Sequence, residues 1–162
     1  MSELLFNELP RPTFRWLRVN HTVSSLAGED TAVQSIAVEA NKDILSPLPV
    51  GTALLDGNYE GANKEAVHVL VEKAEGYAIN VPPKAKEVVG IRIDANARVA
   101  NRFQFIVGEG AELEVQFYVT GSGDSLTNVS YLNEYDVKEA GKVVVKKVNL
   151  LPEHVQHIEH RY

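Results

Sequence analysis

The chain has 162 residues, of which 44% are hydrophobic and 23% charged, the composition of one globular domain with its own core. It contains no cysteine, which excludes disulfides, thiolate catalysis and thiolate ligation of zinc or an iron–sulfur cluster by this chain. No apolar run of about 18 residues is present, so no membrane-spanning segment is expected. The first six residues lack the pattern of a secretory signal.

The net charge of −6 is unevenly distributed. Residues 107–137 contain no Lys or Arg but six acidic residues, namely Glu109, Glu112, Glu114, Asp124, Glu134 and Asp136. A phosphate backbone is repelled by such a surface, so nucleic acid is not expected as a partner. The acidic residues indicate either a solvated outer face of a sheet or an acidic docking surface.

The first 20 residues predict an extended arm, or a short helix followed by a crossing strand. Pro10 and Pro12 disfavour a continuous helix there. Trp16 is the only tryptophan, and we expect it to anchor this arm by burial rather than to stack on a ligand.

The next segments give mixed signals. Residues 31–40 fit a helix or a strand, and the prolines and glycine of residues 46–51 predict a turn. Residues 65–73 predict a short helix after an N-cap at Asn63, although a strand is also compatible with the alternating valines. Gly76 then suits a left-handed cap.

The second half of the chain reads as short strands separated by corners rich in Gly, Asn or Asp. The predicted strands are residues 77–81, 88–93, 103–107, 113–119, 131–137 and 143–150.

A repeat links these strands. Residues 107–115 (VGEGAELEV) reappear as residues 137–145 (VKEAGKVVV), and residues 81–88 are a looser earlier copy. Such a period indicates stacked supersecondary units, because one unit cannot bury its apolar face alone. We therefore expect Val107 to lie beside Val137 in a β-solenoid, with a β-sandwich as the alternative. The predicted division is residues 1–63, an arm and mixed region, and residues 64–162, the β core.

Several stretches together resemble one known family. They are residues 9–12 (LPRP), 15–18 (RWLR), 76–82 (GYAINVP), 106–113 (IVGEGAEL), 126–129 (LTNV) and 137–143 (VKEAGKV). In order and spacing they resemble the SufB/SufD proteins of the SUF iron–sulfur cluster assembly system, and the SufD branch in particular. Residues 76–82 are similar to the family's entry into its β-helix, and residues 106–113 to the coil that follows.

The resemblance implies an all-β fold, a right-handed parallel β-helix behind a small N-terminal arm or α/β region. It also implies a cytoplasmic, non-enzymatic scaffold that partners the SufC ATPase and a SufB-like subunit. The cluster would be handled by the larger complex, with no cofactor bound by this chain alone. Family members are longer, and the chain has no Ser-His-Gly-Ala-Thr segment, so no functional residue can be carried over. We expect a fragment or a shortened relative.

The histidines are the main candidates for chemistry. His154, His157 and His160 lie at intervals of three and could bind a metal on one face of a helix. The repeat predicts a strand there instead, and no acidic or thiol residue completes a ligand set of known spacing. His21 and His68 stand alone. No catalytic, cofactor-binding or metal-binding residue is therefore assigned.

Three functional hypotheses follow. The first is the SufD-like scaffold, with unpaired strand edges that predict a homodimer. The second is a small-ligand or sugar-binding β-sandwich, including a cupin-like metal enzyme. The third is an interaction module with no link to cluster assembly. Glu109 and Glu139, at matching repeat positions, are interpreted as solvent-facing corner residues rather than paired catalytic carboxylates.

Overall fold

The structure is a computed structural model that describes residues 4–6, 22–24, 36–57, 64–95, 99–121, 127–153 and 155–162. Its elements are β1 (Leu4–Phe6), β2 (Thr22–Ser24), β3 (Ile36–Glu39), β4 (Leu45–Leu48), α1 (Lys64–Lys73), β5 (Gly76–Val81), β6 (Lys86–Asp94), β7 (Val99–Val107), β8 (Glu112–Thr120), β9 (Thr127–Val137), β10 (Lys142–Leu150) and β11 (Val155–Arg161). Strands β1 and β2 form a small antiparallel pair of their own. The other strands form two sheets, with the orders β10-β8-β6-β3 and β11-β9-β7-β5-β4.

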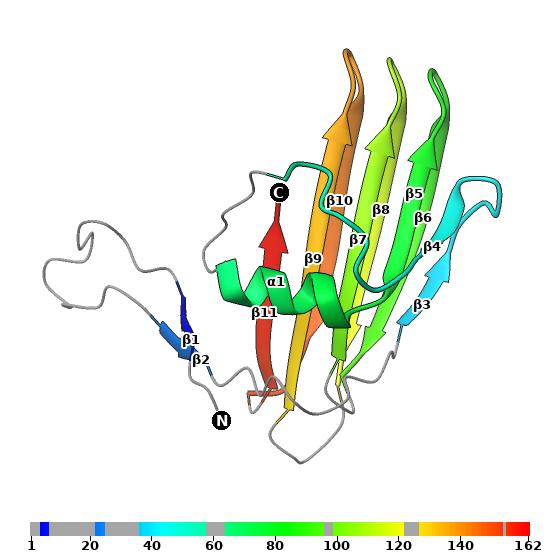
Figure 1. The fold of residues 1–162 in the computed structure, drawn as a ribbon. Helices are drawn as coiled ribbons and strands as arrows, with labels where there is room; N and C mark the ends of the chain where they lie inside the picture. The colour runs from blue at the N-terminus through cyan, green and yellow to red at the C-terminus, as the bar shows by residue number, and fades with distance from the viewer. Residues whose placement is uncertain are drawn as a thin grey trace, which may run out of the picture.

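From β5 onwards the chain passes alternately through the two sheets, which face each other (Figure 1). Strands β5, β7, β9 and β11 pair in parallel in one sheet, and β6, β8 and β10 do so in the other. Equivalent strands of successive passes therefore lie side by side. The predicted strands of the second half of the chain are confirmed, with longer bounds than expected.

The register confirms the expected stacking of the repeat. Val81 pairs with Val107, and Val107 pairs with Val137, so successive passes are 26 and 30 residues long. The difference lies between Thr120 and Val129, at the end of the sheets opposite the repeated corners. The insertion thus leaves both the strands and their register unchanged.

The three repeated corners are four residues each and stack by backbone hydrogen bonds. The N–H of Lys84 donates to the carbonyl of Glu109, and the N–H of Gly110 donates to the carbonyl of Glu139. The third residue of every corner has a left-handed backbone, with φ of 64° at Lys84, 63° at Gly110 and 55° at Ala140. One turn geometry therefore recurs, although only one copy carries glycine at the position that needs it.

The prediction of an all-β, right-handed parallel β-helix is wrong. Both sheets are mixed, because β3 pairs antiparallel with β6 and β4 pairs antiparallel with β5. Helix α1 makes the fold α/β, and neither sheet closes into a barrel. The alternative prediction, an all-β sandwich, is also wrong, because the fold contains helix α1 and because the strands from β5 onwards pair in parallel within each sheet. The repeat predicts how equivalent strands pair with one another. It does not predict β3, β4 or α1, which precede the repeated strands.

The core lies between the two sheets. Alternate residues point inward, so Val89, Ile91 and Ile93 of β6 are buried in the same cluster as Leu113, Val115, Phe117 and Val119 of β8. Aromatic rings connect the sheets: the ring of Phe117 lies edge-on to Phe103 at a centroid distance of 5.8 Å, and stacks with Tyr131 at 5.8 Å. Burial of these side chains is the main stabilising contribution.

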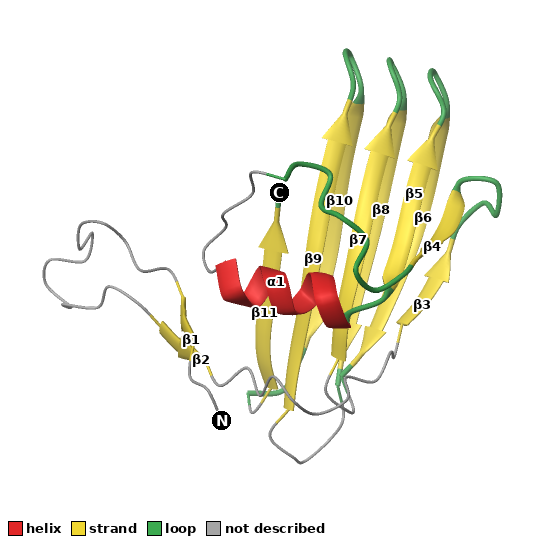
Figure 2. Ribbon diagram, viewed as in Figure 1, coloured by secondary structure: helices red, strands yellow, loops and turns green. Residues whose placement is uncertain are grey.

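Helix α1 covers the outer face of the five-stranded sheet (Figure 2). Val67, Leu70 and Ala74 are buried against Leu132, which projects outward from β9. The predicted helix at residues 65–73 is confirmed. Gly76 does not cap it in a left-handed conformation; it begins β5, where a Cβ atom would overlap the carbonyl of Arg102.

A buried ion pair holds residues 52–55 on the same outer face. Nη2 of Arg102 lies 3.0 Å from Oε2 of Glu134, and both side chains are 0% exposed. Nη1 of Arg102 donates to the carbonyl of Thr52 at 2.7 Å, and the N–H of Leu55 donates to Oε1 of Glu134 at 2.7 Å. Gln104 bonds to both Glu134 and the carbonyl of Ala53. The network pairs two charges that would otherwise be costly to bury, although Nε of Arg102 has no hydrogen-bond partner in the described structure.

Other expectations for the first half of the chain are partly corrected. Residues 45–48 form the edge strand β4, which accommodates Pro47, and only the following residues turn. Residues 36–39 of the ambiguous segment 31–40 are a strand, and residues 31–35 lie outside the described residues. Strands β3 and β4 precede the predicted boundary at residues 63/64 and pair with strands that follow it. Trp16, His21 and Asn63 lie outside the described residues.

Among the described helical residues, no stretch has the length and apolar content needed to cross a bilayer.

We predict that Ala140→Gly stabilises the protein by about 0.5–1 kcal/mol, because the left-handed conformation strains an alanine by more than glycine loses in chain entropy. Gly110→Ala should destabilise it by about 1 kcal/mol for the same reason. Steric overlap does not explain the second effect, since a Cβ at Gly110 would meet only Cγ of Lys84, at 3.9 Å. Urea unfolding of both variants measures the difference, and equal effects of one sign would contradict the prediction.

We also predict that Glu134→Ala destabilises the protein by roughly 3–5 kcal/mol, because it leaves the guanidinium of Arg102 buried without its counterion. The matched control is Glu72→Ala, which removes the carboxylate of an exposed pair with His68. It should change the free energy of unfolding by no more than about 0.5 kcal/mol. Similar losses in the two variants would show that burial of the pair is not what matters.

Candidate functional site

The two sheets end on the same side at β10 and β11, which together are called the terminal edge here (Figure 1). Polar side chains replace the apolar core between these two strands. Lys147 and Asn149 continue the inward row that Val143 and Val145 begin on β10. The polar group, called the terminal cluster, consists of Tyr131, Asn133, Lys147, Asn149, His157, Glu159 and Arg161.

His157 lies at the centre of the terminal cluster. Its Nε2 is 3.0 Å from the hydroxyl of Tyr131 and 3.3 Å from Nζ of Lys147, and its Nδ1 is 3.2 Å from Nδ2 of Asn149. Asn149 is oriented by the N–H of Leu151, which donates to its Oδ1. Donors thus face both ring nitrogens, and a protonated imidazole would direct an N–H at each of them. This arrangement favours neutral His157.

Glu159 is the anion that compensates the cations. Its carboxylate accepts hydrogen bonds from Nζ of Lys147 at 2.7 Å, from Nε of Arg161 at 2.8 Å and from Nδ2 of Asn133 at 2.9 Å. The side chains of Lys147 and Glu159 are only 16% and 13% exposed. The ammonium of Lys147 also lies 5.0 Å from the ring centroid of Tyr131. Partial burial strengthens these contacts relative to surface ion pairs.

The pKa values of the cluster reflect this environment. Burial lowers the pKa of His157 below 6.5, and the charge of Lys147 lowers it further. Burial alone would raise the pKa of Glu159, but hydrogen bonds from Arg161 and Lys147 lower it overall. Next to the cluster, burial and the nearby charge of Glu159 raise the pKa of Tyr135 to about 12. At neutral pH the cluster therefore holds neutral His157 and ionised Glu159.

The geometry of the cluster fits a structural role better than a catalytic one. Its bonds join β9, β10 and β11, so they link the last strands of the two sheets. None of its seven members is a Ser, Thr or Cys nucleophile placed beside the imidazole. The described residues include no group of three or more side chains placed to hold a metal ion.

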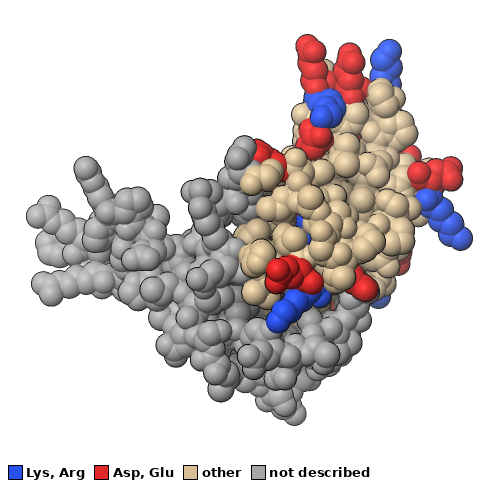
Figure 3. Space-filling view, viewed as in Figure 1, with Lys and Arg blue, Asp and Glu red and all other residues tan. Residues whose placement is uncertain are grey.

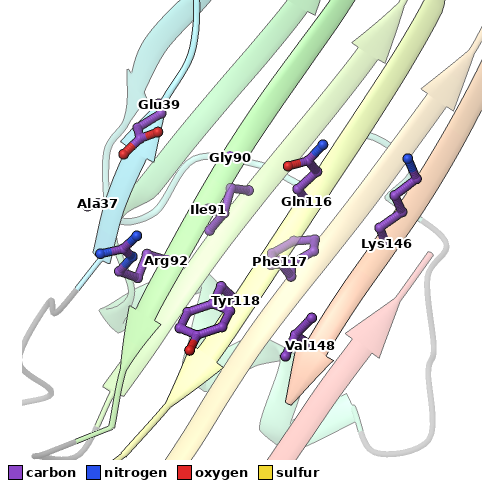
Figure 4. Close-up of a pocket in the computed structure, with 10 residues that line it drawn as sticks. All are labelled: Ala37, Glu39, Gly90, Ile91, Arg92, Gln116, Phe117, Tyr118, Lys146 and Val148. Carbon is purple, nitrogen blue, oxygen red and sulfur yellow. The ribbon is translucent and has the colours of Figure 1, made fainter. Parts of the chain in front are cut away.

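A second feature is a hollow of about 400 Å³ on the outer face of the four-stranded sheet (Figure 4). It opens above Gly90, which has no side chain to fill the space between Glu39 and Gln116. The guanidinium of Arg92 lies over the ring of Tyr118 at 5.8 Å, and Val148 occupies the next position of that row. Neighbouring side chains thus flank the ring of Tyr118, leaving it a poor stacking platform for a ligand.

The predicted acidic surface is not one surface. Glu112 and Glu114 project from β8 towards lysines of neighbouring strands, at 2.9 Å from Lys86 and 2.8 Å from Lys146. Glu134 is buried, and Asp136 pairs with Lys138. Figure 3 shows acidic and basic side chains together at the corner end of the sheets and again lower on the same face, with a largely uncharged area between them. Lysines from outside residues 107–137 pair with these carboxylates. Parallel pairing of the strands brings Lys86 and Lys146 next to the glutamates of β8.

Of the three neighbouring histidines, the structure describes the side chain of His157 alone. His157 points into the terminal cluster, whereas His154 and the side chain of His160 lie outside what the structure describes. The predicted strand in this region is confirmed as β11. His68 forms an exposed pair with Glu72 on α1. Glu109 and Glu139 are exposed in adjacent corners, as expected.

Sequence reasoning missed the terminal cluster, although a signal was present. His157, Glu159 and Arg161 alternate along the chain, as do Lys147 and Asn149, so polar residues occupy every inward position of these segments. Polar residues at every second position, on a face that is apolar in earlier passes, indicate the end of a core. Sequence reasoning instead grouped the histidines at intervals of three, and so did not recognise that the polar residues alternate as in a strand.

No protein-family model, curated protein or solved structure matches this chain. The site must therefore be interpreted from its own geometry.

We predict that the free energy of unfolding falls on acidification below pH 6.5, because the unfolded chain binds a proton at His157 more readily than the folded one. The contribution of His157 to the free energy of unfolding is fully present above its ordinary pKa. It is lost as the pH falls from that value towards the lower pKa of His157 in the folded chain. The lowered pKa of Glu159 adds a second loss at pH values below 4.5. Urea unfolding at several pH values should show a smaller decline between pH 7 and 5 in His157→Gln than in the wild type.

His68→Gln is the control, because this exposed histidine lies on α1, away from the terminal cluster. It should retain the pH dependence of the wild-type protein. An unchanged pH profile in His157→Gln would contradict the proposed role of the neutral imidazole.

Proposed function

We propose that this chain is a non-enzymatic scaffold that acts through protein–protein contacts at its terminal edge. The observation that carries the proposal is the position of β10 and β11, each the last strand of its sheet on the same side of the fold. Each has a strand neighbour on one side only within the described part of the chain. Unpaired strand edges are templates for strands of another polypeptide.

The surface beside this edge supports the same role. Val148 and Leu150 project outward from β10 and are 49% and 57% exposed. The terminal cluster keeps the inner side of the edge ordered by joining β9, β10 and β11. A rigid edge lowers the entropic cost of docking a partner.

The sequence resemblance supplies the setting of the proposal. Residues 76–82 and 106–113, which resemble SufB/SufD segments, form β5 and the β7–β8 corner that order the stacked strands. By this resemblance the chain acts in the cytoplasm in iron–sulfur cluster assembly, with a SufC-like ATPase and a SufB-like subunit as partners. The cluster itself is handled by the larger complex. The predicted homodimer is a rival occupant of the same edge.

The small-ligand and cupin-like alternatives gain no specific support. Two polar side chains that line the hollow, those of Lys146 and Gln116, already form hydrogen bonds with Glu114. The interaction module unrelated to cluster assembly shares the terminal edge with the first proposal and differs only in its partner.

Co-purification with a SufC-type ATPase and a SufB-type subunit, followed by hydrogen exchange, tests the proposal. We expect capture of at least one of them, and slower exchange of the amides of β10 and β11 in the complex, because new strand pairing protects edge N–H groups. The amides of α1 are the internal control and should not change. Protection confined to α1 would refute the terminal edge as the docking surface, and failure to capture either protein would refute the link to cluster assembly.

A further inference from the structure

We infer that the terminal edge accepts an acidic strand of a different polypeptide through Lys142 and Lys146, and disfavours a second copy of this chain. The inference rests on the proposed docking role and adds the chemistry of the partner. It starts from the charge of β10, which contains Lys142, Lys146 and Lys147 and no acidic residue. A strand with three cations in nine residues is unusual in a chain whose net charge is −6.

Charges alternate from strand to strand on the outer face of the four-stranded sheet. One row consists of Lys86 on β6, Glu112 on β8 and Lys142 on β10. Glu112 therefore has a cation on either side, and its pKa is lowered by a hydrogen bond from Lys86 and, to a smaller extent, by the charges of both lysines. Among the paired strands that the structure describes, Lys142 has an acidic neighbour on one side only. A strand added beyond β10 would complete the alternation if it placed a carboxylate opposite Lys142.

The second outward lysine leads to the same conclusion. Nζ of Lys146 lies 2.8 Å from both carboxylate oxygens of Glu114, which is two residues before its register partner Gln116 on β8 and thus its diagonal neighbour. Its side chain remains 60% exposed. An ammonium group has three donors, so a second carboxylate can be accommodated from the open side. Lys142 and Lys146 lie on the same face, four residues apart along the strand, and thus select acidic side chains at that spacing.

A second copy of the chain fits the edge poorly. Two-fold antiparallel pairing of β10 with its counterpart, in full overlap, places Lys146 opposite the same lysine of the other copy. Like charges directly opposite each other in a ladder are destabilising. Lysines on edge strands are a common protection against self-association. Stacking of β10 on β3 of another copy would offer one carboxylate, that of Glu39, on a strand of only four residues.

The test uses the protein itself as the acidic probe. The variant Lys142→Glu/Lys146→Glu carries an acidic β10, and two-fold pairing with the wild type places a glutamate opposite Lys146. In sedimentation velocity at low salt, we expect the mixture to associate roughly five- to tenfold more tightly than either protein alone. The difference should diminish in about 0.5 M salt, where exposed charges are screened.

The control is Lys42→Glu/Lys84→Glu, which has the same net charge as the test variant and changes two exposed lysines away from β10. Its mixture with the wild type should not associate more tightly than the wild type alone. Because added glutamates beside Glu112 and Glu114 could weaken the fold, Lys142→Gln/Lys146→Gln is the second variant. It should self-associate more tightly than the wild type, since the opposed lysines are removed.

Three results would overturn the inference. They are self-association of the wild type as tight as that of the mixture, open-ended growth of wild-type species with concentration, and no association of the mixture. The first would assign the edge to a second copy, and the second would indicate head-to-tail stacking. Both would leave the terminal edge as a docking surface, whereas the hydrogen-exchange experiment tests the docking surface independently of its charge.

Discussion

The in-register parallel pairing of equivalent strands is the constraint on which the rest of the structure depends. Because Val81, Val107 and Val137 occupy one ladder, the alternation of each strand directs every apolar set into the same space between the sheets. The hydrogen-bonded corners maintain this register at one end. A slip of one residue would turn the buried phenylalanines outward, so the register and the core are inseparable.

The same register determines how polar residues are used. On the outer face of the five-stranded sheet it brings Gln104 opposite Glu134 and Arg102 diagonally next to it, where α1 and residues 52–55 enclose them. On the other outer face it places lysines beside the glutamates of β8. The same strand register thus produces a buried ion-pair network on the outer face of one sheet and exposed lysine–glutamate pairs on the outer face of the other.

The terminal edge differs from the interior because, among the strands that the structure describes, β10 and β11 each have a neighbour on one side only. An apolar inner face would be partly exposed to solvent there, whereas the polar terminal cluster tolerates water and still joins the two sheets by hydrogen bonds. His157 contributes as a neutral hydrogen-bonding ring, which makes this end of the fold sensitive to acid. The docking role proposed for the edge derives instead from the edge strands β10 and β11, and the chemistry of its occupant derives from the outward-facing lysines of β10.

The sequence by itself determined the strands from residue 77 onwards, the stacking of Val107 on Val137 and the existence of the short helix, because each depends on local periodicity or on a repeated corner. Tertiary structure decided the mixed character of the sheets, since β3 and β4 are too short for their direction of pairing to be encoded locally. Tertiary structure also decided which side chains meet in the polar networks. Arg102 and Glu134 are 32 residues apart in the sequence, and His157 and Tyr131 are 26 residues apart. Side chains so distant in sequence meet only after the register is set, and the register is a property of the assembled sheets.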